Sequence, residues 1–206
     1  MRDQNIFIFI GRSGSGKGTQ VDLFKKYLEE RESKQADPLS IFHLSTGDSF
    51  RSFIKSDSYS SELSREILDK GGLQPSFLAI WIWGQVFIDN VKGKEHIITD
   101  GFPRALNEAK ILDTAISFYK KTPVVVYLNL SEESVYKRLL LRQRHDDNRE
   151  AIGERMSYFK NDVLPVVEYY KNNPDYNFVE IDGEPSIEEI QRDIVSKISK
   201  IWQISE

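Results

Sequence analysis

The sequence predicts an α/β fold, a doubly wound parallel five-stranded sheet flanked by helices. Short apolar runs that are typical of buried strands alternate with stretches whose apolar residues recur at helical spacing. The first apolar run continues directly into a glycine-rich loop and a helix start, IFIFIGRSGSGKGTQ, over residues 6–20. The run PVVVYLNL at 123–130 is unbroken in its apolar character, as in a parallel sheet that is covered on both faces. Such strands are joined by right-handed crossovers.

The remaining elements follow from periodicity and from breaker residues. Pro38 interrupts the first helical pattern, Ser45 or Thr46 is suited to cap the second helix, and the pair Gly71 and Gly72 ends the third. After the first strand we expect, in order, a helix at 21–31, a strand at 41–44, helices at 46–54 and 60–70, a helix that begins near residue 75, a strand at 96–99, a helix at 106–119, a strand at 123–130, helices at 132–142 and 150–171, a strand at 178–181 and a helix at 187–202.

The helix that begins near Pro75 is rich in apolar residues. Its sequence gives it a continuous apolar face through Trp81, Val86 and Ile88. We therefore expect Trp81 and Trp83 to pack in the core.

Composition limits the class of protein. The chain has 206 residues, of which 39% are hydrophobic, which suits a single domain over 1–206. With 28 basic and 32 acidic residues the net charge is −4, so we expect neither nucleic acid nor an anionic membrane as a partner. The absence of cysteine excludes disulfides and cysteine-ligated zinc. The N-terminus lacks a signal-like pattern and the apolar runs are too short for a bilayer, so we expect a cytoplasmic protein.

The glycine-rich loop GRSGSGKGTQ is suited to bind a triphosphate. Its glycines allow backbone N–H groups to approach phosphate oxygens, and Lys17 adds a positive charge. The general phosphate-loop template has Ser or Thr directly after the lysine, whereas here Gly18 precedes Thr19. The alternative is a flexible glycine-rich turn, but the strand before it and the amphipathic helix after it favour a phosphate loop.

Polar residues follow each predicted strand, at the edge where ligands bind in such sheets. The segments are STGDSFR after the second strand, TDGFPR after the third and, after the fourth strand and the helix that follows it, RQRHDD. An acid opposite a phosphate loop is placed to hold Mg²⁺, directly or through water, and Asp100 is the candidate. The alternative for Asp100 is a turn or helix cap before Gly101.

These motifs together resemble the adenylate kinase family of nucleoside monophosphate kinases, in family order and over nearly the whole chain. They are GRSGSGKGTQ, HLSTGDSFR, GGLQP, DGFPR, RLLLRQRHDDNREAIGER and IDGEPSIEEI. The resemblance implies the short-lid type of phosphate-loop nucleoside monophosphate kinase, with a helical monophosphate-binding insertion. It divides the domain into a core at 1–44, 94–141 and 156–206, an insertion at about 45–75 and a very short lid at about 142–148.

The resemblance also implies residue roles. Those expected to bind ATP are Gly14, Ser15, Gly16, Lys17, Gly18, Thr19, Arg138 and Gly183. Those expected to bind AMP are Thr46, Arg51, Leu73, Gln74, Gly101, Arg104, Glu108, Arg144 and Arg155. The catalytic set is Lys17, Arg104, Arg142, Arg144 and Arg155, with Asp146 and Asp147 as lid hinge and orienting acids and Asp100 for Mg²⁺. Planar arginine donors match phosphoryl oxygens, although any one helical arginine taken alone is equally consistent with a solvated surface.

The chain departs from the family pattern at three places. Ser13 stands where proline is common, and only Gln143 separates Arg142 from Arg144, so the lid is short and carries no zinc. Glu108 stands where adenylate kinases usually have a glutamine that reads AMP. A carboxylate accepts a hydrogen bond from the adenine amino group but cannot donate one to the ring, whereas Thr46 favours AMP.

The expected function is reversible Mg²⁺-dependent transfer of the ATP γ-phosphoryl group to AMP, giving two ADP, by a monomer. No general base is needed, because the accepting phosphate is already ionised. The alternatives are a UMP, CMP or other nucleoside monophosphate kinase and a degenerate nucleotide-binding protein. A switch GTPase is disfavoured, because no asparagine-lysine base motif follows the strand at 123–130.

Overall fold

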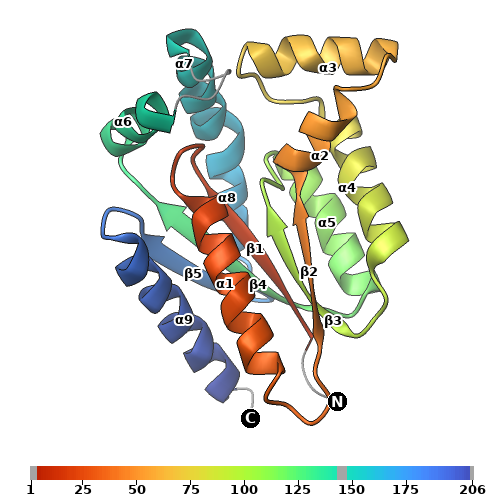
Figure 1. Ribbon diagram of the computed structural model, residues 1–206, viewed down its shortest axis with the longest axis vertical. Coiled ribbons are helices and arrows are strands. Elements are labelled where there is room, and N and C mark those ends of the chain that lie inside the picture. The colour runs from red at the N-terminus through yellow and green to blue at the C-terminus, as the bar shows by residue number, and fades with distance from the viewer. Residues whose placement is uncertain (1–3, 143–147, 205–206) are drawn as a thin grey trace.

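The computed structural model describes residues 4–142 and 148–204, the side chains of the last two excepted, and has a five-stranded parallel sheet between two helical layers (Figure 1). The strand order is β2-β3-β1-β4-β5, which confirms the predicted fold class. The strands are β1 (Asn5–Gly11), β2 (Ser40–Ser45), β3 (Glu95–Asp100), β4 (Thr122–Asn129) and β5 (Asn177–Asp182). Because every neighbouring pair is parallel, all the carboxyl ends lie at one edge of the sheet.

The helices connect these strands as crossovers. They are α1 (Lys17–Glu32), α2 (Thr46–Phe53), α3 (Tyr59–Asp69), α4 (Ser76–Asn90), α5 (Leu106–Phe118), α6 (Glu132–Arg142), α7 (Arg149–Tyr158), the π-helical segment η1 (Phe159–Val163), α8 (Leu164–Lys171) and α9 (Ile187–Ile204). Within the described residues, each helix is too short or too polar to cross a membrane.

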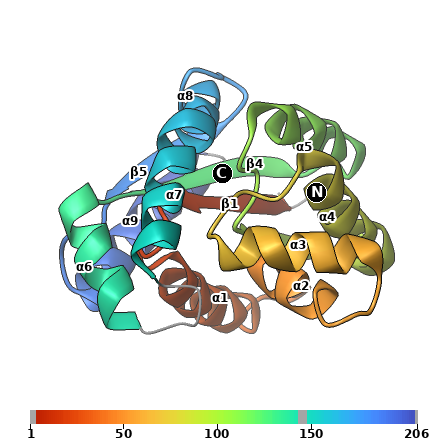
Figure 2. The ribbon, with the colours of Figure 1, turned by 90° about the horizontal axis from the view of Figure 1, so that it is seen from above.

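The central strand β1 distributes its side chains between two cores. Phe7 and Phe9 belong to the core that α1 and α9 cover, whereas the isoleucines at positions 6, 8 and 10 belong to the core beneath α4, α5 and α8. Successive residues of a strand point to opposite faces, so an unbroken apolar strand serves both layers. The two layers are visible in Figures 1 and 2.

The prediction of one continuous buried face on α4 is partly wrong. Trp83 is buried, but Trp81 is 55% exposed and Ile88 is 73% exposed. Helix α4 is apolar around most of its circumference: the side that carries Trp83 and Phe87 faces the core under the sheet, and Leu78, Ala79 and Ile82 form a smaller core with Phe50 of α2. Trp81 lies on the outer side and packs edge-on against Phe53 of α2, with ring centroids 6.1 Å apart.

The single helix predicted for 150–171 is interrupted. The chain forms α7, then the π-helical turn η1, then α8. Pro165 stands in the first turn of α8 and has no N–H to donate to a carbonyl of the preceding turn. A wider π turn accommodates that missing hydrogen bond.

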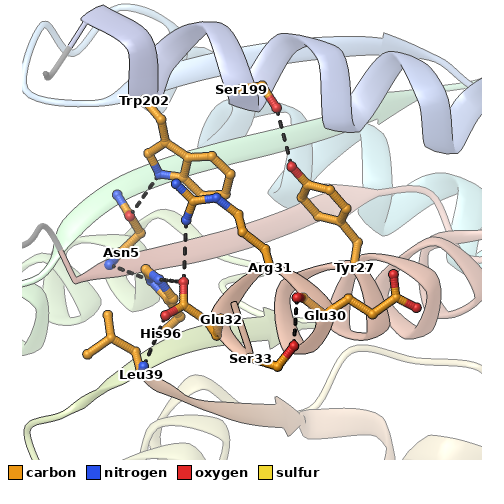
Figure 3. A network of polar contacts seen from close by, with 10 residues as sticks. All are labelled: Asn5, Tyr27, Glu30, Arg31, Glu32, Ser33, Leu39, His96, Ser199 and Trp202. Atoms are coloured by element: carbon orange, nitrogen blue, oxygen red, sulfur yellow. Dashed lines mark hydrogen bonds and ion pairs between the residues drawn. The ribbon is translucent and has the colours of Figure 1, made fainter. Parts of the chain in front are cut away.

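A polar network joins four elements at the amino ends of the strands, the edge opposite the phosphate loop (Figure 3). The N–H of Asn5 donates to Nδ1 of His96 (3.1 Å), and the indole of Trp202 donates to Oδ1 of Asn5 (3.1 Å). Nδ1 of His96 thus acts as an acceptor, and Nε2 lies 3.4 Å from Oε1 of Glu32. The other oxygen of Glu32 accepts from the N–H of Leu39 (3.0 Å).

A buried ion pair lies at the same edge of the sheet. Nζ of Lys121 is 2.9 Å from Oε1 of Glu95, and both side chains are almost fully buried. Burial raises the pKa of Glu95, but hydrogen bonds from Lys121 and from the backbone of Lys92 and Gly93 outweigh it and hold the pKa below its ordinary value. The pair is therefore charged and stabilised by more than one donor.

Lys121→Met should lower the free energy of unfolding by about 3 kcal/mol, because it leaves the carboxylate of Glu95 buried without its cation. Urea denaturation followed by circular dichroism measures the loss. The matched control is Lys171→Met, since the pair of Lys171 with Glu180 is half exposed and should contribute less than about 1 kcal/mol. If both variants lost the same small amount of unfolding free energy, the stabilising role of the buried pair of Lys121 with Glu95 would be contradicted.

Candidate active site

Two adjoining cavities lie at the carboxyl ends of the strands. The larger has a volume of about 550 Å³ and is bounded by the loop after β1, by the ends of β2 and β3, and by residues of α2, α6 and α7. The smaller, of about 110 Å³, lies between the insertion formed by α2 and α3 and the start of α5. Figure 2 looks down on this edge, with α6 and α7 on one side and α2 and α3 on the other.

The phosphate loop holds its lysine with backbone carbonyls. Nζ of Lys17 donates to the carbonyl oxygens of Gly11 (2.8 Å) and Arg12 (3.0 Å). Helix α1 begins at Lys17, directly after Gly16, which has no side chain with which to cap the helix. The N–H groups of the first turn and the positive end of the helix dipole thus favour an anion in the larger cavity.

The ammonium of Lys17 titrates at a lower pH than an ordinary lysine. The pKa of Lys17 is lowered to about 8, mainly by removal from water; the carboxylate of Asp100 opposes this shift, and the charges of Arg104 and Arg142 add to it. Lys17 is thus mostly charged at neutral pH, and a bound polyanion would hold its proton more firmly.

Two arginines are also held by carbonyl oxygens. Nε of Arg104 donates to the carbonyl of Gly101 (2.7 Å), and Arg138 donates to the carbonyls of Gly183 (2.9 Å) and Ser15 (3.4 Å). A carbonyl fixes the direction of a guanidinium without cancelling its net charge. The arrangement keeps positive charge available to an anionic ligand.

Gly101 permits a close approach between two of the predicted ligand residues. Its φ is +85°, and a Cβ at this position would lie 2.8 Å from Oγ1 of Thr46 and 3.3 Å from Arg104. Any side chain here would therefore be strained and would collide with the hydroxyl of Thr46. That hydroxyl donates to the carbonyl of Asp100 (3.4 Å), which joins the start of α2 to the end of β3.

Arg51 is paired with an acid that the sequence reasoning did not single out. Its guanidinium lies 2.6 Å from Oδ1 of Asp48, one turn earlier on α2, and both side chains are exposed. The hydrogen bond from Arg51 holds the pKa of Asp48 below its ordinary value. Ser45 caps the same helix by accepting from the N–H of Asp48 (3.3 Å), one of the two predicted caps.

Glu108 lies on the wall of the smaller cavity and is only 1% exposed. Burial raises the pKa of Glu108, while a hydrogen bond from the backbone N–H of Arg104 (3.0 Å) and the charge of that arginine oppose the rise. Gln74 lines the same cavity, but both ends of its amide are bonded to Ser64. Its side chain thus joins α3 to the following loop.

The predicted residues gather at these cavities. The larger is lined by Gly14, Gly16, Lys17, Gly18, Thr19, Arg51, Asp100, Gly101, Arg104, Arg138 and Arg142. The smaller is lined by Thr46, Arg51, Leu73, Gln74, Gly101, Arg104, Glu108, Arg142 and Arg155. Ser15 and Gly183 line neither cavity and contact the site through Arg138. Arg144, Asp146 and Asp147 lie outside the described residues.

Further residues of the larger cavity were missed. His43, Asp22 and Asp48 line it, and Tyr158 lines both cavities and accepts a hydrogen bond from Arg104 (3.4 Å). Helical spacing was the available signal. Asp22 stands four residues after Gly18, so the two share one face of α1.

Comparisons with known proteins agree on one family. The adenylate kinase family model matches residues 9–175. An adenylate kinase of Azobacteroides pseudotrichonymphae genomovar. CFP2 is 34% identical over 206 residues, covering 97% of this chain and 99% of that protein. Adenylate kinases of Prochlorococcus marinus (strain MIT 9515) and Rickettsia bellii (strain RML369-C) are 34% and 32% identical, covering 93% and 95% of this chain and 97% and 99% of their own lengths.

The pKa of Lys17 predicts the pH dependence of nucleotide affinity. Because free Lys17 has a pKa of about 8, ATP affinity should be full below that pH and should fall as the pH rises through it. Calorimetric titration with ATP in EDTA, from about pH 6.5 to 9.5, measures the effect. In Lys17→Arg the affinity should stay constant over this range, because a guanidinium does not deprotonate there. A constant affinity in the unaltered protein would contradict the prediction.

Proposed function

Because this chain belongs to the adenylate kinase family, we propose that its two adjoining cavities bind ATP and AMP and that the cations between them assist phosphoryl transfer. The protein is an ATP:AMP phosphotransferase, which converts ATP and AMP into two ADP. One observation carries the assignment of this reaction to the site: Lys17, Arg104 and Arg138 lie at one edge of the sheet and are oriented by carbonyl oxygens.

The reaction brings two polyanions together, so its main requirements are positioning and neutralisation of charge. Lys17 and the N–H groups at the start of α1 bind the β- and γ-phosphates of ATP. The carbonyl of Gly183 and the guanidinium of Arg138 mark the side of the cavity that holds the adenine of ATP. The hydrogen bond between them (2.9 Å) supports this placement.

On the acceptor side, Arg51 and Arg104 bind the phosphate of AMP, and Arg142 and Arg155 close on the transferred group. The ion pair of Arg51 with Asp48 is exposed, so exchange of that carboxylate for a phosphate costs little. The insertion at about 45–75 closes over AMP with Thr46, Leu73 and the backbone of Gln74. The short lid at about 142–148, with Arg144, Asp146 and Asp147, completes the site.

Asp100 is suited to Mg²⁺, which the family generally uses with ATP. Its carboxylate lies beside the phosphate loop, where a Cβ on Gly18 would be 4.0 Å from Oδ2, and it acts electrostatically on Lys17. Within the described residues no group of three or more acidic or histidine side chains could hold a metal alone, so phosphates and water would supply the other ligands. When bound, Mg²⁺ supplies neutralising charge to the phosphates.

The buried carboxylate of Glu108 is also compatible with monophosphates other than AMP as the acceptor. The buried carboxylate of Glu108 accepts hydrogen bonds, so it fits any base that presents an amino group, which includes cytosine and guanine as well as adenine. A degenerate binding protein is disfavoured by the presence of Lys17, Asp100 and the arginines in one cavity.

Arg104→Ala should lower kcat/KM for both substrates by about 100- to 1000-fold, because it removes a charged donor from the developing charge. The free energy of unfolding should change by less than about 1 kcal/mol. A coupled phosphoryl-transfer assay and urea denaturation measure the two effects. The control is Arg149→Ala, since Arg149 is exposed and lines neither cavity. If the Arg104 variant unfolded, the role of this arginine would be to stabilise the fold, which would contradict the prediction.

Glu108→Gln should raise kcat/KM for AMP about fivefold, because the amide can donate to the adenine ring while its oxygen keeps the bond from Arg104, and one net hydrogen bond is worth about 1 kcal/mol. The assay uses ATP, Mg²⁺ and AMP, UMP, CMP, GMP or dTMP in parallel. A wild-type preference for a monophosphate other than AMP would contradict AMP as the acceptor and would identify Glu108 as the residue that changed specificity.

A further inference from the structure

Arg12 belongs to the phosphate loop, but its side chain lines neither cavity. The side chain is 13% exposed and packs between segments that are distant in sequence. One guanidinium nitrogen donates to Oε1 of Glu132 (3.0 Å), the first residue of α6. Cζ lies 4.2 Å from the ring centroid of Phe159, the first residue of η1.

The hydrogen bonds of Arg12 alone do not explain why its side chain is packed here. Nε of Arg12 is buried and has no hydrogen-bond partner among the described residues. A buried donor without a partner costs free energy, so Nε itself does not stabilise this packing. The contacts of the guanidinium include the stacking on Phe159, the ion pair with Glu132 and an interaction with the hydroxyl of Tyr127 in β4.

The two partners of Arg12 belong to the helical segments on either side of the lid. Helix α6 starts at Glu132 and carries Arg138 and Arg142 toward the larger cavity. Phe159 directly follows α7, which carries Arg155. A single guanidinium thus connects the phosphate loop to both helices that present the arginines of the site.

The backbone of Arg12 contacts the catalytic lysine. Its carbonyl oxygen accepts from Nζ of Lys17 (3.0 Å) and from the N–H of Ser15 (3.1 Å). The loop also packs directly on α6, because a Cβ on Gly14 would lie 2.7 Å from Cγ of Leu139. A displacement of Arg12 relative to α6 would therefore move the acceptor that orients Lys17.

We propose that Arg12 is a positioning residue that sets the distance between Lys17 and the arginines of α6 and α7. The loop is rich in glycine and flexible by composition, so an external contact is needed to hold it against those helices. Arg12 supplies this contact through Glu132 and Phe159. The inference rests on the proposed function, since it assigns Lys17 to ATP.

The test compares Arg12→Ala, Arg12→Lys and Phe159→Leu with the unaltered protein. Arg12→Ala should weaken ATP affinity about tenfold and lower kcat about tenfold, with KM for AMP unchanged within about twofold, because the proposed function assigns Lys17 to ATP and not to AMP. Arg12→Lys keeps the ion pair but not the planar stacking, so it should restore part of the loss. Phe159→Leu should resemble Arg12→Lys, and the double variant Arg12→Ala/Phe159→Leu should be no worse than Arg12→Ala.

The matched control is Arg31→Ala. The guanidinium of Arg31 stacks on Trp202 (3.9 Å) and lies 3.3 Å from Glu32, which reproduces the same pair of contacts at the opposite edge of the sheet (Figure 3). Its removal should lower Tm to a similar degree without changing kcat or ATP affinity. Equal kinetic parameters in the two alanine variants, at a temperature where both are folded, would overturn the proposal.

Calorimetric ATP affinity separates this proposal from the proposed function. If the unaltered protein transferred no phosphoryl group to any monophosphate, the proposed function would fail. ATP affinity about tenfold weaker in Arg12→Ala would then still support the role of Arg12, and an unchanged affinity would overturn it.

Discussion

The structure depends on holding several cations together at the carboxyl edge of the sheet. Carboxylates would stabilise such a cluster but would also compete with the nucleotide for it. Backbone carbonyls avoid this conflict, because their partial charge orients Lys17, Arg104 and Arg138 and leaves the net charge in place. This requires loops whose carbonyls converge on one point, and the carboxyl edge of a parallel sheet provides them. The depressed pKa of Lys17 reflects mainly its removal from water, with a smaller contribution from the charges of Arg104 and Arg142.

The two edges of the sheet treat buried charge in opposite ways. At the amino edge, Lys121 is paired with Glu95 and a carboxylate oxygen of Glu32 faces His96, so the buried charges have partners within the fold. At the carboxyl edge, positive charge is left for a ligand. The first arrangement favours stability and the second favours binding, and the apolar strand β1 runs between them with a side chain in each core along its length.

The sequence was sufficient for whatever depends on local pattern and on spacing. Alternating strands and helices, the glycine-rich loop and the acid that ends β3 were all predicted, and each predicted strand is present. The prediction that Trp81 is buried was wrong, because it depended on which side of α4 faces the core. Helix α4 is apolar nearly all round, so its composition could not show that Trp81 faces outward. The stacking of Arg12 on Phe159 was equally beyond prediction, because it joins distant segments and neither residue carries a local signal.

The π turn at η1 has a consequence for how this protein can vary in length. An α-helix advances about 100° per residue, so the extra residue of a π turn shifts the phase of everything on one side of it. That phase lets Arg155 and Tyr158 line the site while Val166, Val167 and Tyr170 pack in the core. Deleting one residue between Phe159 and Val163 would regularise the helix and rotate Arg155 away from the cavity. Side chains in this segment can therefore be exchanged more readily than its length can be changed.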